Sequence, residues 1–67
     1  MNASDIKSKS EEELIELFID GDDVSIGNVT IYIHYYESTG MFWILNQLGT
    51  IGKMFYVEDF KKYMEKL

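Results

Sequence analysis

The chain has 67 residues, no cysteine, one histidine and a net charge of −6. This length allows one small domain with one core, and the composition excludes disulfides, thiolate metal sites and a zinc site of ordinary composition. A domain of this size buries only about 60% of the surface that its unfolded chain exposes. Its stability therefore depends on a very good core, a partner or self-association.

Residues 10–20 are predicted to form a helix. Ser10 and Glu13 have the spacing of a capping box, in which each side chain accepts a hydrogen bond from the other residue's amide. The apolar stripe of this helix is Leu14, Leu17 and Phe18. Gly21 is well placed to end the helix. Residues 1–9 are expected to be frayed, or to extend the helix backwards through Ile6.

The middle of the chain is predicted to form an antiparallel sheet of three or four strands, because it is rich in β-branched and aromatic residues. The expected strands are residues 24–26, 29–36 and 41–46, with 53–57 as either a last strand or the start of the last helix. Gly27-Asn28 is either a tight hairpin turn or a bulge in one long strand. Residues 37–40 form a hairpin loop, and residues 47–52 reverse the chain again.

A second helix is predicted near the C-terminus. Glu58 and Asp59 supply acidic side chains to its first turn, where they complement the helix dipole. Its apolar stripe is Phe60, Met64 and Leu67. The order of elements indicates an α+β fold in a single domain spanning residues 1–67, with both helices on one face of the sheet.

The segment from Val29 to Leu45 is apolar or aromatic on both faces of the predicted strands. A half-buried strand normally alternates apolar with polar residues. A loop of two or four residues puts these side chains on one face: Ile31, Ile33, Tyr35, Phe42 and Ile44. It puts these on the other: Tyr32, His34, Tyr36, Met41, Trp43 and Leu45. A loop of odd length exchanges the two sets from the second strand.

Two short helices can cover only one face of a small sheet. We expect them on the face that carries Ile31, Ile33 and Tyr35, because this set is the less polar one. The opposite face then stays open, and tyrosine and tryptophan are favoured at the centres of protein interfaces. The open face thus supplies four candidate partner-binding residues: Tyr32, His34, Tyr36 and Trp43. An ordinary solvated sheet face is the alternative interpretation.

Charge is distributed unevenly along the chain. Residues 1–23 carry eight acidic side chains and two lysines, whereas residues 24–67 carry four of each. An acidic surface of this kind can guide a protein onto a basic partner, or it can be a solvated helix face. The candidate contact residues in this region are Glu12, Glu16, Asp20, Asp22 and Asp23. Direct binding of nucleic acid is not expected, because the chain has no arginine and phosphate recognition depends on basic groups.

Motifs for chemistry are incomplete. A calcium loop starting at Asp20 lacks its central glycine and terminal glutamate, and the phosphate-loop-like Gly49 to Lys53 lacks its first glycine and its final serine or threonine. His34 has no serine or carboxylate placed by sequence to complete a catalytic triad. We therefore expect no catalytic residue, no metal and no cofactor.

The leading hypothesis is a small acidic protein, without enzymatic activity, that binds a larger and basic nucleic-acid-handling protein, for example as an inhibitor. Small acidic inhibitors from bacteriophages, including anti-restriction and anti-CRISPR proteins, share this profile of size and charge, and that similarity is one of composition. The alternative is a homodimeric assembly protein that packs through its aromatic sheet face. The chain lacks a signal-peptide pattern and a 20-residue apolar span, so a cytoplasmic location is expected.

Overall fold

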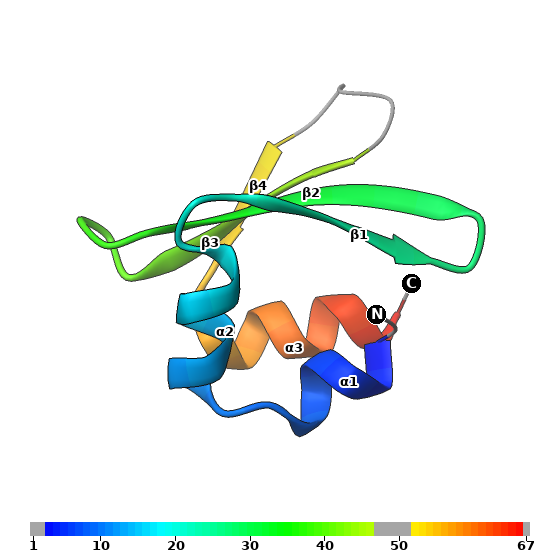
Figure 1. Cartoon of the computed structure of the whole chain (residues 1–67), viewed down its shortest axis with the longest axis horizontal. Coiled ribbons are helices and arrows are strands. Elements are labelled where there is room, and N and C mark those ends of the chain that lie inside the picture. The colour runs from blue at the N-terminus through cyan, green and yellow to red at the C-terminus, as the bar shows by residue number, and fades with distance from the viewer. Residues whose placement is uncertain (1–2, 47–51, 67) are drawn as a thin grey trace.

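A computed structural model describes residues 3–46 and 52–66 of the chain. The elements are α1 (Ala3–Ser8), α2 (Glu11–Phe18), β1 (Asp22–Ile26), β2 (Val29–Tyr36), β3 (Met41–Asn46), β4 (Gly52–Phe55) and α3 (Val57–Glu65). The strands form one antiparallel sheet in the order β1-β2-β3-β4. The three helices of the described residues all lie on the same side of this sheet (Figure 1). The predicted α+β class is confirmed, with four strands.

α2 begins at the capping residue that its sequence predicts and ends at Phe18, two residues before the predicted end. The amide of Glu13 donates to the Ser10 hydroxyl at 3.2 Å, and the amide of Ser10 donates to the Glu13 carboxylate at 3.1 Å. Gly21 has a φ of +83° and its amide donates to the carbonyl of Phe18 at 3.1 Å. The capping box and the glycine stop are therefore both confirmed.

The capping box gives the stability of the protein a predictable dependence on pH. The hydrogen bond from the Ser10 amide, followed by that from its hydroxyl, lowers the pKa of the Glu13 carboxyl below its ordinary value. A carboxyl with a lowered folded-state pKa stabilises the fold above its unfolded-state pKa, and this contribution disappears as the pH falls through the folded-state pKa. Glu13→Gln should therefore be less stable than wild type at neutral pH, and urea denaturation should show the difference shrinking in acid. A difference that stays constant with pH would contradict this role of the carboxylate.

Residues 3–8, where the sequence suggested a frayed start, form the separate helix α1. Ser10 has an extended backbone conformation, which ends α1 and turns the chain before α2 begins. Ile6 is fully buried, and Lys7 forms an ion pair with Glu65 of α3. Lys61 of α3 also donates from Nζ to the Lys9 carbonyl at 2.7 Å. Long-range packing against α3 thus orders a segment whose own sequence is a weak helix former.

The two described hairpins have short, well-defined loops. Ile26 pairs with Val29, so Gly27-Asn28 is a two-residue hairpin turn and not a bulge. Gly27 has a φ of +61° and no residue other than glycine has a positive φ among those described, which is the pattern of a type II′ turn. Tyr36 pairs with Met41, so the loop between β2 and β3 contains four residues.

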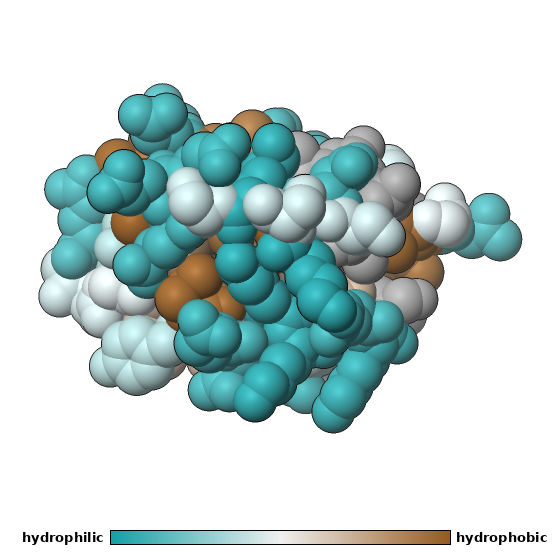
Figure 2. Space-filling model, turned by 90° about the horizontal axis from the view of Figure 1, so that it is seen from below, coloured by the Kyte–Doolittle hydropathy of each residue, from teal (hydrophilic) through white to brown (hydrophobic). Residues whose placement is uncertain are grey.

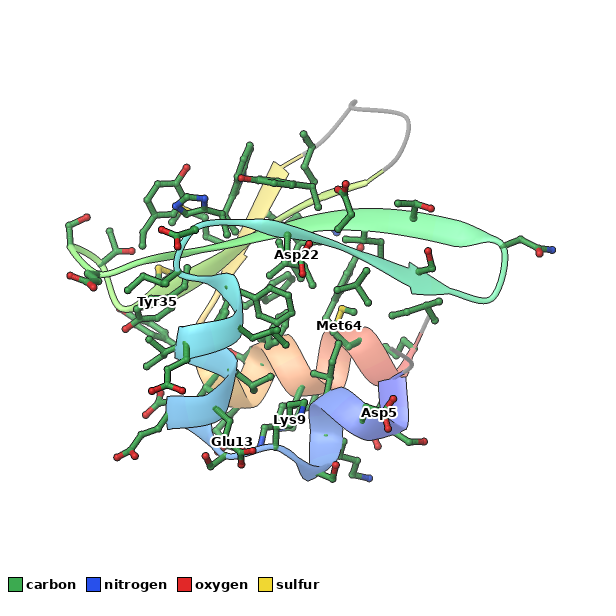
Figure 3. All side chains as sticks on the ribbon, viewed as in Figure 1. Asp5, Lys9, Glu13, Asp22, Tyr35 and Met64 are labelled. Atoms are coloured by element: carbon green, nitrogen blue, oxygen red, sulfur yellow. The ribbon has the colours of Figure 1, made fainter. Side chains whose placement is uncertain are left out.

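The core lies between the sheet and the helices. Its buried residues are Ile6, Leu14, Phe18, Val24, Ile26, Ile31, Ile33, Phe42, Ile44, Phe60 and Met64. Phe42 of β3 stacks on Phe60 of α3 with ring centroids 4.5 Å apart, and Phe18 of α2 meets both rings edge-on. Met64 points from α3 toward the sheet (Figure 3). Leu67, from the last predicted apolar stripe, and residues 47–51, from the predicted chain reversal at 47–52, are outside the described residues. Gly52, the last residue of that predicted reversal, instead begins β4.

The helical side of the molecule is mainly hydrophilic, and apolar colour is confined to small patches there (Figure 2). Among the described residues, no helix has the length and apolar character that crossing a bilayer requires.

Candidate functional site: the outer sheet face

The outer face is defined as the side of the sheet that points away from the three helices. The register pairs His34 with Trp43 and Ile33 with Ile44, so the tyrosine-bearing set and the isoleucine-bearing set lie on opposite faces. The outer face consists of Asp23, Ser25, Thr30, Tyr32, His34, Tyr36, Met41, Trp43, Leu45 and Met54. This is the arrangement that the sequence predicts for an even-numbered loop. Figure 3 shows aromatic side chains rising from the sheet on the side opposite the helices.

The four aromatic candidates lie in direct contact with one another. Trp43 is central, with its ring centroid 6.0 Å from that of Tyr32 and 6.3 Å from that of Tyr36. The ring centroids of His34 and Tyr36 are 4.6 Å apart, and the two rings are tilted relative to each other. The Tyr32 hydroxyl and His34 Nδ1 are 3.1 Å apart, within hydrogen-bond distance. The structure thus joins Tyr32, His34, Tyr36 and Trp43 into one continuous cluster.

Two glycines allow side chains of this cluster to approach the backbone closely. A Cβ atom at Gly21 would overlap the Tyr32 hydroxyl oxygen and lie 2.9 Å from His34 Nδ1. A Cβ atom at Gly52 would overlap Nε1 of Trp43 and lie 3.0 Å from Cε2. The close approach restricts where the rings can move, so less conformational entropy remains to be lost when a ligand binds them.

The acidic candidates do not form one patch with the aromatic cluster. Asp23 is opposite Tyr32 in the register and belongs to the outer face, whereas Asp22 alternates to the other side. Asp20 is exposed in the turn that leads to Gly21. Glu12 and Glu16 lie one turn apart on α2, within the helical layer. The sequence could not show that Glu12 and Glu16 lie away from the outer face, because helical spacing does not show where α2 sits relative to the sheet.

No described lysine lies on the outer face. Three of them lie on α3 or immediately after it, at positions 61, 62 and 66, and Lys7 and Lys9 lie on or just beyond α1. Lys53 of β4 pairs with Ile44, which places it on the inner side, and its Nζ is 5.6 Å from the centroid of the Tyr63 ring. The outer face therefore combines aromatic rings with the Asp23 carboxylate and carries no permanent cation among the described residues.

A hollow of about 270 Å³ opens on the outer face beside the loop between β2 and β3. Its lining residues are Tyr36, Ser38, Thr39, Trp43 and Met54. Sequence reasoning missed Met54, Ser38 and Thr39 as contributors. The pairing of Trp43 with Met54 brings β4 to this hollow, and that pairing could have been predicted only if residues 53–57 had been assigned to a strand.

A second hollow, of about 320 Å³, lies on the helical side beside the start of α2. It is lined by Lys9, Glu13, Glu16 and Leu17. Its lining carries both a positive lysine and two negative glutamates, and the Glu13 carboxylate already accepts the hydrogen bond of the capping box. This hollow therefore indicates no particular ligand.

The residues that the structure describes contain no group of three or more histidine, cysteine or acidic side chains that could hold a metal ion. The chemistry that the outer face offers is contact with a ligand through aromatic and apolar surface and a few hydroxyl groups. No known protein family, curated protein or solved structure matches the chain.

Proposed function

We propose that this protein is a small acidic binding protein, without catalytic activity, whose outer face contacts a larger basic protein. The uncovered aromatic cluster carries the proposal. All helices pack on the inner side of the sheet, so no described element covers Tyr32, His34, Tyr36 and Trp43. Tyr36 and the neighbouring Met54 are 38% and 41% exposed, and Tyr32, His34 and Trp43, which pack on one another, are half-buried.

Charge favours a basic partner over a second copy of the chain. Each copy carries a net charge of −6, so two copies repel each other, whereas a basic surface is attracted. The described lysines lie away from the outer face, so a basic partner that docks there meets no like charge from them. Nucleic-acid-handling proteins have basic surfaces of this type, and inhibition by occupying such a surface is the role that we propose for the protein.

Capture from a lysate of the source organism tests this function. Tagged wild type should retain a protein with a basic surface, and Trp43→Ala should weaken the measured affinity by about thirtyfold or more, the effect of losing a residue at the centre of an interface. Tyr56→Ala is the matched control, because Tyr56 is 60% exposed and precedes α3. It should weaken the affinity far less than Trp43→Ala does, because Tyr56 is not part of the aromatic cluster and exposed residues around an interface centre contribute little.

Two further measurements distinguish a basic partner from a second copy of the chain. The association rate should fall as salt is added. Asp20→Asn with Asp23→Asn should slow association more than Glu12→Gln with Glu16→Gln does, because Asp23 lies on the outer face and Asp20 precedes Gly21, whose backbone the Tyr32 ring approaches. Sedimentation should show a monomer at micromolar concentration. A dimer that Trp43→Ala converts to monomer would contradict the proposal and favour the homodimeric assembly protein.

A further inference from the structure

The hollow beside the loop between β2 and β3 is lined by aromatic and apolar side chains and by hydroxyl groups. Tyr36 and Trp43 supply aromatic walls with ring planes inclined at 60°, and Met54 supplies an apolar one. Ser38 and Thr39 supply hydroxyl groups from the loop between β2 and β3. An aromatic pair that opens beside hydroxyl oxygens suits a side chain that is both flat and rich in hydrogen-bond donors.

The loop holds the Thr39 hydroxyl in place. Thr39 Oγ1 donates to the carbonyl of Tyr36 at 3.4 Å and accepts from the amide of Met41 at 3.3 Å. A hydroxyl oxygen has two lone pairs, so one remains for a donor from outside. The orientation of this group is fixed before a ligand arrives, which reduces the cost of binding.

The electrostatics of the hollow favour a cation. Aromatic faces carry partial negative charge and attract guanidinium or ammonium groups within about 6 Å. Glu37 stands in the chain between Tyr36 and Ser38, two of the lining residues, and adds a carboxylate to the same exposed loop. The described lysines all belong to the inner side of the sheet or to the helical layer.

We propose that this hollow binds the side chain of one arginine from the basic partner. The inference rests on the proposed function and names the contact through which that function acts. Arginine fits better than lysine, because its planar guanidinium stacks on aromatic rings, is weakly hydrated and presents five donors. An ammonium group is more strongly hydrated than a guanidinium group and cannot stack on the rings.

The test uses small probes in place of the partner. Trp43 is the only tryptophan of the chain, so protein labelled with fluorotryptophan gives a single fluorine resonance from the wall of the hollow. N-acetyl-arginine amide should shift this resonance saturably. N-acetyl-citrulline amide, which has the same shape without the charge, should bind about tenfold more weakly, and the lysine amide should lie between them. Equal binding of arginine and citrulline, or no saturable shift with arginine, would overturn the proposal.

Variants locate the site. Tyr36→Leu keeps the apolar bulk and removes the aromatic face, so it should reduce the arginine effect to the citrulline level. Tyr56→Leu makes the same change outside the hollow and should leave the titration unchanged. An arginine effect that persists in Tyr36→Leu would overturn the assignment of this hollow. The probes need no partner, so this proposal can fail while capture still finds a basic protein, and capture can fail while the hollow still binds arginine.

Discussion

Replacing Phe42 with alanine is expected to unfold the protein. Phe42 is fully buried in β3, stacks on Phe60, meets Phe18 edge-on and lies 4.9 Å from the Tyr35 ring. Truncating a buried phenylalanine to alanine typically costs about 3–5 kcal/mol, through lost burial and the cavity that remains. A domain of this length has a total stability of about 3–10 kcal/mol. Loss of the far-ultraviolet circular dichroism signal, or a large fall in the urea midpoint, checks this.

Tyr56→Ala is the control for Phe42→Ala, since it also removes one aromatic ring. Tyr56 is 60% exposed and its side chain makes no capping hydrogen bond to α3. Its truncation should change the free energy of unfolding by about 0.5 kcal/mol or less, as for an ordinary surface position. Equal losses in the two variants would show that the Phe18, Phe42 and Phe60 cluster is not the centre of the core.

Gly21→Ala is expected to destabilise the protein and to disturb the outer face at the same time. Its φ of +83° lies in the left-handed region, which costs an alanine about 1–2 kcal/mol. The added Cβ would also overlap the Tyr32 hydroxyl oxygen and lie 2.7 Å from Cζ of the same ring. Overpacking of this kind typically adds about 1–3 kcal/mol. Urea denaturation measures the sum, and the fluorine resonance of Trp43 reports the displacement of the ring cluster.

Gly27→Ala separates the two contributions. Gly27 also has a positive φ, at +61°, but nothing lies within 4 Å of the position that its Cβ would take. Gly27→Ala should therefore lower the free energy of unfolding only by the cost of the left-handed backbone conformation, with no contribution from overpacking. Combining Gly21→Ala with Tyr32→Phe should recover part of the packing loss, because the hydroxyl is removed while Cζ stays. No recovery, or equal losses at both glycines, would contradict a packed contact between Tyr32 and Gly21.

Local patterns predicted most of the fold. The capping box of Ser10 and Glu13 and the alternation along β2 depend on neighbours in the chain, and both appear as expected. The helix α1 was missed, because Ile6 is buried by α3, which lies more than fifty residues further along. The turn at Gly27-Asn28 stayed undecided, because one glycine allows either a hairpin or a bulge until the pairing of Ile26 with Val29 is known.

The candidate site was predicted in part. Because loop length fixes which side chains share a face, Tyr32, His34, Tyr36 and Trp43 could be grouped once the four-residue loop was assumed. The contribution of Met54 depends on how β4 pairs with β3. The position of Glu12 and Glu16 depends on how α2 packs. Neither is encoded in a local pattern, so the hollow and the separation of the acidic residues were found only in the structure.

The measurement that most directly tests the outer face as the contact surface is fluorine NMR of Trp43 in the complex with the captured partner. Wild type labelled with fluorotryptophan should give one new resonance on binding, and that resonance should be less sensitive than the free one to a soluble quencher or paramagnetic agent. A complex that forms while the Trp43 resonance keeps its position and its solvent sensitivity would contradict the account.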